Sequence, residues 1–163
     1  MTDHSVDLVI LGGGSGGYAT ALRAAELGSS VMLIEKDKLG GTCLHRGCIP
    51  TKALLHSAEV ADSIRGSEHV GVRATLEGID IAGVHAYREG IVAKKHKGLE
   101  GLIAARKITV VHGEGRLEAD GGVTVGDDRY RGTDVVLATG SYSRSLPGLE
   151  LDDRIITSEG ALA

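Results

Sequence analysis

A run of glycines near the start of the chain restricts its fold more than any other feature. Residues 12–17 read GGGSGG and fill the three glycine positions of the G-x-G-x-x-G pattern. A β-branched, nearly all-apolar run precedes them at residues 6–11, and residues 15–27 show helical spacing up to Gly28. Such glycines allow a tight turn, close approach of a pyrophosphate to the backbone, and close packing of helix on strand. The motif predicts an α/β fold in which residues 6–11 form a central, fully buried parallel strand.

The next strand ends in an acidic residue. Residues 30–35 repeat the strand pattern and end at Glu35, 18 residues after Gly17. The two strands and their helix form a predicted βαβ unit with a right-handed crossover. A carboxylate at this position can accept hydrogen bonds from an unphosphorylated ribose, so FAD or NAD fits better than NADP. The alternative is a surface acid that pairs with Lys36 or Lys38.

The rest of the chain predicts two further helices and a set of short strands. Helical spacing covers residues 48–64, with Pro50 tolerated in the first turn, and residues 81–106. Residues 134–138 read as another buried strand. Short runs separated by Gly and Asp turns predict a small antiparallel meander, at residues 108–111, 115–118, 123–125 and 129–130. The predicted fold class is therefore a Rossmann-like FAD/NAD(P)-binding domain with a central parallel sheet, flanking helices and this meander.

Cys43 and Cys48 are the only cysteines of the chain. A close pair downstream of a nucleotide motif indicates a reversible dithiol/disulfide. A place at a helix start would lower the pKa of a thiol through the helix dipole and favour disulfide exchange. Two ordinary buried thiols or half of a metal site are the alternatives. The spacing lies outside C-x2–4-C and no second pair completes a zinc tetrahedron, so no metal site is predicted.

Composition excludes several classes of partner. The net charge is −4, no long basic tract occurs, and Phe and Trp are absent, which disfavours nucleic acid and anionic membrane surfaces. No apolar run approaches the roughly 20 residues of a membrane helix, and the first residues lack the order of a secretory signal. We therefore expect a cytoplasmic location, where a disulfide is catalytic or sensing.

The cysteine segment carries a family resemblance. Residues 40–52 read GGTCLHRGCIPTK and, with the preceding glycine motif, closely resemble the N-terminal flavin segment of the class I pyridine nucleotide-disulfide oxidoreductases. Within that family the segment is most similar to the dihydrolipoamide dehydrogenases, because of Leu44, Ile49 and Thr51. His45 departs from the commoner Asn. The resemblance covers practically the whole chain.

The resemblance implies a role for each matching residue. Cys43 would exchange with the dithiol substrate, Cys48 would lie against the flavin, and Lys52 would approach the flavin N5. Thr42 would lie near the pyrophosphate. For Lys52 an exposed helix lysine is the alternative, and for Gly115 a simple strand turn. The implied cofactor-binding residues are Gly12, Gly14, Ser15, Gly16, Gly17, Glu35, Lys36, Gly41, Thr42, Lys52, Gly115, Ala138, Thr139, Gly140 and Ser141.

The resemblance also implies an activity. A family member of this type is an FAD enzyme that oxidises dihydrolipoamide, borne on lipoyl domains of 2-oxo acid dehydrogenase complexes, with NAD⁺ as final acceptor, and works as a homodimer. The alternatives are a related NAD(P)H-dependent disulfide or quinone reductase and a non-catalytic dinucleotide-binding module. A second glycine motif and a C-terminal His–Glu pair are not found in this sequence.

These missing motifs bear on the domain content of the chain. We expect residues 1–163 to be the N-terminal part of the FAD-binding domain, without the nicotinamide-binding and C-terminal dimerisation domains. Because part of the cofactor's envelope would then be missing, we expect the chain alone to be inactive and to bind FAD weakly or not at all.

Overall fold

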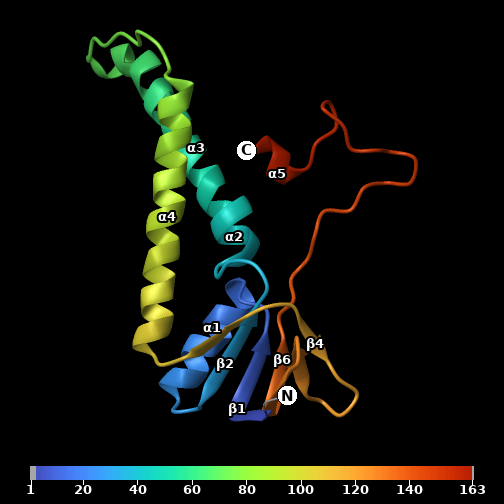
Figure 1. Ribbon diagram of the computed structural model, residues 1–163. Helices are drawn as coiled ribbons and strands as arrows, with labels where there is room; N and C mark the ends of the chain where they lie inside the picture. Colours follow the sequence, from blue (N-terminus) through green and yellow to red (C-terminus); the bar gives the residue numbers. More distant parts are fainter. Residues whose placement is uncertain (1–2, 163) are drawn as a thin grey trace.

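The predicted strand–turn–helix unit is present in the computed structural model, which describes residues 3–162 (Figure 1). β1 (Asp3–Leu11), α1 (Ser15–Glu26) and β2 (Val31–Glu35) follow in order, and β1 pairs in parallel with β2. The helix ends before Gly28, whose φ of 93° suits a helix stop. The predicted βαβ unit is confirmed. Met1 and Thr2, on which part of the expectation about a secretory signal rests, lie outside the described residues, as does residue 163.

One six-stranded sheet runs through the molecule in the order β3-β2-β1-β6-β5-β4. β3 (Thr109–His112) pairs in parallel with β2, and β6 (Asp128–Leu137) pairs in parallel with β1. β4 (Gly115–Leu117) and β5 (Val123–Val125) form an antiparallel ribbon with the first residues of β6. The inner position of β1 and the α/β fold class are confirmed.

The predicted meander is wrong in two respects. Residues 108–111 were expected in it, but β3 joins the parallel part of the sheet, because its apolar side chains pack beside those of β2. Residues 129–130 and 134–138 were expected as two strands, but they lie in one ten-residue strand and its extension. β6 therefore pairs with β1 along its length and with β5 only at its beginning.

The end of β6 is also less buried than predicted. Its pairing with β5 stops at Tyr130, and among the described residues no strand pairs with the outer edge of residues 131–137. Leu137 is 58% exposed, whereas its partner Leu11 on β1 is buried. The outer edge of β6 is therefore paired at residues 128–130 and unpaired, among the described strands, at residues 131–137.

Two apolar clusters cover opposite faces of the sheet, as alternation along the strands requires. On one face, Ile10 and Leu33 pack with Ala21 of α1 and Ile103 of α4 (Ile81–Ala105). On the other face, residues of the meander pack against β1 and β2. The buried members of this second cluster are Val9, Leu11, Met32, Ile34, Val123 and Tyr130. The core is aliphatic apart from one tyrosine.

The remaining helices rise from the carboxyl end of the sheet (Figure 1). α2 (Gly41–Arg46) was not predicted; Gly47 joins it to α3 (Cys48–Arg65), which confirms the helix expected over residues 48–64. η1 (Ser67–Val70) leads to α4, which packs along α3 and confirms the helix expected over residues 81–106. After residues 138–157, which contain no helix or strand, α5 (Ser158–Ala161) returns to the α2–α3 corner. No described helix is both long and apolar enough to cross a membrane.

The glycine turn gives a test of this packing. A Cβ on Gly17 would lie 1.7 Å from the carbonyl oxygen of Gly12, so α1 would have to move away from β1. We expect Gly17→Ala to lower the free energy of unfolding by roughly 1–3 kcal/mol. Gly16→Ala is the control, because a Cβ there meets nothing within 4 Å, and alanine should add about 0.5–1 kcal/mol. Urea denaturation measures both, and equal effects would contradict the assigned contact.

Candidate functional site

The three glycines of the motif occupy different surroundings. Gly12 has a φ of 107°, and a Cβ there would lie 2.2 Å from the carbonyl oxygen of Ala138. Gly17 is pressed against Gly12 in the same manner. Gly14 differs, because the atom nearest to a Cβ there would be the Gly41 Cα at 3.9 Å. The first and third glycines therefore serve the turn and the packing, whereas the second leaves space beside the backbone.

The Glu35 carboxylate fixes this turn. Its Oε2 accepts a hydrogen bond from the Gly13 N–H at 2.6 Å, and its Oε1 accepts one from the Asp37 N–H at 2.8 Å. None of the ion pairs found within residues 3–162 involves Lys36 or Lys38, the partners of the alternative reading. Glu35 thus has a structural task at the glycine turn that the sequence pattern did not indicate.

A cavity of about 140 Å³ opens beside the turn, at the carboxyl ends of β1 and β2. In parallel α/β sheets, ligands bind at this edge. Five of the predicted cofactor residues line the cavity: Gly12, Glu35, Lys36, Gly115 and Thr139. Next to the cavity, Gly14 is the N-cap residue of α1 and provides no side-chain cap. The first N–H groups of α1 are therefore available to an anion. Ser15 and Gly16, both predicted, form this exposed first turn.

The cysteine segment begins directly on the glycine turn. The Gly40 N–H donates to the Gly13 carbonyl oxygen at 2.9 Å. A Cβ on Gly41 would lie 2.7 Å from the Gly14 Cα, and the φ of Gly41 is 57°, so glycine is required there. Thr42 follows and is exposed. The dinucleotide turn and the cysteine segment are therefore one packed unit.

The two cysteines meet at the corner between two helices. Cys43 lies in α2 and is half-buried, and Cys48 is the first residue of α3 and is exposed. Both are free thiols, and Cys48 acts directly on the pKa of Cys43. Lys52, one turn further along α3, is exposed and acts electrostatically on Cys43. The three residues predicted to carry the chemistry thus lie together.

The predicted lowering of the thiol pKa is wrong for Cys43, whose pKa is raised. The hydrogen bond to Cys48 is the largest cause, and burial is the second. The positive charge of Lys52 opposes both but does not outweigh them. Cys43 lies inside the six-residue α2, where a second thiol is a nearer influence than a helix dipole.

The predicted cofactor-binding residues 138–141 only partly reach the cavity. The Ala138 N–H donates to the Leu11 carbonyl oxygen at 2.8 Å, so Ala138 prolongs the ladder of β6 and contacts the glycine turn. Thr139 lines the cavity, but Gly140 and Ser141 lie beyond it in an exposed segment. The structure therefore gathers residues 138–139 at the site and leaves residues 140–141 outside the cavity wall.

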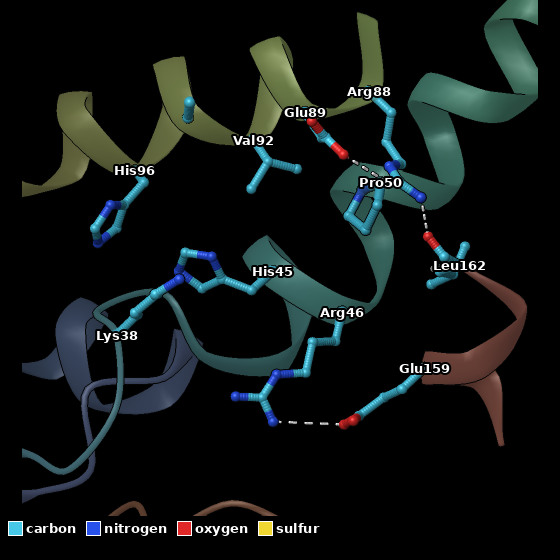
Figure 2. Close-up of a pocket in the computed structure, with 11 residues that line it drawn as sticks. Lys38, His45, Arg46, Pro50, Arg88, Glu89, Val92, His96, Glu159 and Leu162 are labelled. Atoms are coloured by element: carbon cyan, nitrogen blue, oxygen red, sulfur yellow. Dashed lines mark hydrogen bonds and ion pairs between the residues drawn. The ribbon is translucent and has the colours of Figure 1, made fainter. Parts of the chain in front are cut away.

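A larger cavity of about 420 Å³ lies at the α2–α3 corner, between α4 and α5 (Figure 2). No residue predicted as a site residue lines it. Arg46 from the cysteine segment and Glu159 from α5 do, and the pattern indicated neither, because only the return of α5 brings them together. Within residues 3–162, no group of three or more His, Cys, Asp or Glu side chains could hold a metal ion.

Comparison with known proteins gives consistent relatives. The model of the family described as pyridine nucleotide-disulphide oxidoreductase matches residues 6–163. The chain is 42% identical to a dihydrolipoyl dehydrogenase of Bacillus subtilis, over 96% of the chain and 36% of the relative. It is 40% identical to a leghemoglobin reductase of Vigna unguiculata, over 96% of the chain and 32% of the relative.

A solved structure resembles the chain as well. The crystal structure of LpdA from Mycobacterium tuberculosis matches with a TM-score of 0.80 and 26% sequence identity, over 99% of this chain and 37% of that one. The chain spans about a third of the length of the curated relatives it matches.

The raised pKa of Cys43 predicts how its alkylation responds to two substitutions. Alkylation consumes the thiolate, so at a fixed pH below the pKa the rate rises when the pKa falls. Cys48→Ala removes the hydrogen bond that raises the pKa, so Cys43 should react faster. Lys52→Gln removes the charge that lowers it, so Cys43 should react more slowly. Iodoacetamide rates for the reduced protein at about pH 8, read on the Cys43 peptide by mass spectrometry, check both. Changes in the same direction would contradict this electrostatic balance.

Proposed function

The chain belongs to the pyridine nucleotide-disulphide oxidoreductase family, and we propose that it forms the FAD-binding, disulfide-bearing part of an enzyme that oxidises dihydrolipoamide with NAD⁺ as final acceptor. The observation that carries this proposal is that the cysteine segment packs on the glycine turn, through the hydrogen bond from the Gly40 N–H to the Gly13 carbonyl oxygen. A dinucleotide site and a redox pair built as one unit suit electron transfer between them. The relative named dihydrolipoyl dehydrogenase supports the choice of substrate.

The residues at the edge of the sheet fit FAD. Glu35 would bind the adenosine ribose, Gly14 and the uncapped start of α1 would receive the pyrophosphate, and Thr42 would help to hold it. Cys48, at the start of α3, and Lys52, one turn further along that helix, would face the flavin. When bound, FAD would take up an electron pair from the dithiol and deliver it onward to NAD⁺.

The two cysteines would perform the exchange with substrate. A thiolate of dihydrolipoamide would attack the Cys43 sulfur, break its bond to Cys48 and leave a mixed disulfide on Cys43. The second substrate thiol would then displace Cys43, so that lipoamide leaves as a cyclic disulfide. Two electrons would then reside on the protein as the Cys43 and Cys48 thiols. The direct effect of Cys48 on the pKa of Cys43, at the corner between α2 and α3, supports their assignment as one redox pair.

The homologues also bear on partners and location. As a family member of this type, the protein would take dihydrolipoamide from lipoyl domains of 2-oxo acid dehydrogenase complexes and would work as a cytoplasmic homodimer. The support is the likeness to dihydrolipoyl dehydrogenase and to LpdA.

A second candidate is a flavoprotein reductase that passes electrons from NAD(P)H to a disulfide or quinone. The 40% identity to a relative named leghemoglobin reductase favours it. Both candidates would use the same cysteine pair. Rates with dihydrolipoamide and NAD⁺, set against rates with NADH and disulfide or quinone acceptors, distinguish them.

Gly14 offers a test that separates cofactor binding from folding. A Cβ on Gly14 has open space and its φ is −69°, so Gly14→Ala should leave the unfolding midpoint unchanged. The added methyl group would fill the space assigned to the pyrophosphate, so the affinity for FAD should fall about tenfold or more. Gly98→Ala on α4, also with nothing near its Cβ, is the matched control and should bind FAD normally.

The measurements are made on the polypeptide that the complete reading frame encodes. Flavin absorbance and fluorescence give the affinity, and a Cys43→Ser variant should retain FAD but lose oxidation of dihydrolipoamide. Normal FAD affinity in Gly14→Ala would overturn the cofactor site. Dihydrolipoamide oxidation that survives Cys43→Ser would overturn the role of the redox pair.

A further inference from the structure

Arg46 lies between the two cysteines and contacts two carboxylates from different parts of the chain. Its Nη2 pairs with the Asp37 carboxylate, and its Nη1 lies 3.5 Å from the Glu159 Oε1. Figure 2 shows the guanidinium reaching from the end of α2 to Glu159 on α5. The segment that bears the redox pair is therefore held from two sides.

The Asp37 side of this contact is itself fixed. The Asp37 N–H donates to the Glu35 carboxylate, which also holds the Gly13 N–H of the glycine turn. A continuous series of polar contacts thus runs from the dinucleotide turn through Glu35 and Asp37 to Arg46.

The Glu159 side is fixed as well. α5 carries Glu159, and Arg88 of α4 donates a hydrogen bond to the Leu162 carbonyl oxygen just beyond that helix (Figure 2). The Arg88 side chain is 11% exposed and also pairs with Glu89 at 3.1 Å. α5 is therefore attached at both ends, to α2 through Glu159 and to α4 through Leu162.

From this arrangement we infer that Arg46 is a positioning residue that holds Cys43 in reach of Cys48, with Asp37 and Glu159 as its anchors. The inference deepens the proposed function and rests on it. α2 and α3 meet at Gly47, where no side-chain cap holds the start of α3. The relative placement of the two helices sets the separation of the sulfurs, and a disulfide tolerates little variation in that separation. Because Arg46 is the residue before Gly47, its ion pairs restrain the junction of the two helices and favour the disulfide between Cys43 and Cys48.

The test measures the equilibrium between dithiol and disulfide in mixtures of oxidised and reduced dithiothreitol. Glu159→Gln should shift that equilibrium about fivefold toward the dithiol, as the loss of a half-exposed ion pair permits. For this two-electron couple a fivefold change corresponds to about 20 mV. Arg46→Gln should shift it in the same direction. Loss of the positive charge by itself would destabilise thiolates and shift it the opposite way, so this variant separates tethering from charge.

Asp62→Asn is the matched control. It breaks the exposed pair between Arg65 and Asp62 on α3, at 2.8 Å, which does not touch the cysteine segment. The control should leave the equilibrium unchanged, and thermal unfolding shows whether any variant is merely destabilised. An unchanged equilibrium in Glu159→Gln, a shift toward disulfide in Arg46→Gln, or an equal shift in Asp62→Asn would each overturn the inference alone. A wild-type protein that forms no disulfide between Cys43 and Cys48 would overturn the proposed function together with it.

Discussion

The crowding of backbone at the glycine turn is the constraint on which the rest of the structure depends. β1, α1 and the end of β6 meet there so closely that the Gly12 and Gly17 positions have no room for a side chain. Glu35 then fixes the turn by accepting the Gly13 N–H, and the Gly13 carbonyl oxygen receives the Gly40 N–H. One residue of the turn thus joins the acidic end of β2 to the start of the cysteine segment. The sheet, α1 and the start of the cysteine segment are therefore joined at this turn.

The parts of the fold with a local sequence pattern could be predicted from the sequence, whereas the parts that depend on long-range neighbours could not. The βαβ unit and the helices that begin at Cys48 and Ile81 carry strong periodic patterns, and all were predicted. The parallel pairing of β3 and the continuity of β6 were missed, because they depend on which strands become neighbours and not on local pattern. α2 was missed because six residues are too few for a periodic signal.

In the candidate site, too, features with a local sequence pattern could be predicted, whereas features that depend on tertiary contacts could not. The gathering of Glu35 and the glycine turn at one edge of the sheet could be predicted, because their spacing is itself the signal. The contact of Arg46 with Glu159 could not be predicted, since Glu159 lies more than a hundred residues away and follows a stretch without regular structure. The pKa of Cys43 was misjudged for a related reason. A helix start can be read from sequence, but the hydrogen bond from thiol to thiol belongs to the folded corner.

The outer edge of β6 has a consequence for the behaviour of the protein in solution. Among residues 3–162, this strand pairs on one side only beyond Tyr130, and its end carries the exposed apolar side chain of Leu137. A row of unpaired backbone donors and acceptors is a template for any other extended segment, including the same strand of a neighbouring copy. An edge of this kind favours the addition of such a segment. Within the described part of the chain, residues 131–137 therefore offer the backbone edge to which we expect an extended segment to add.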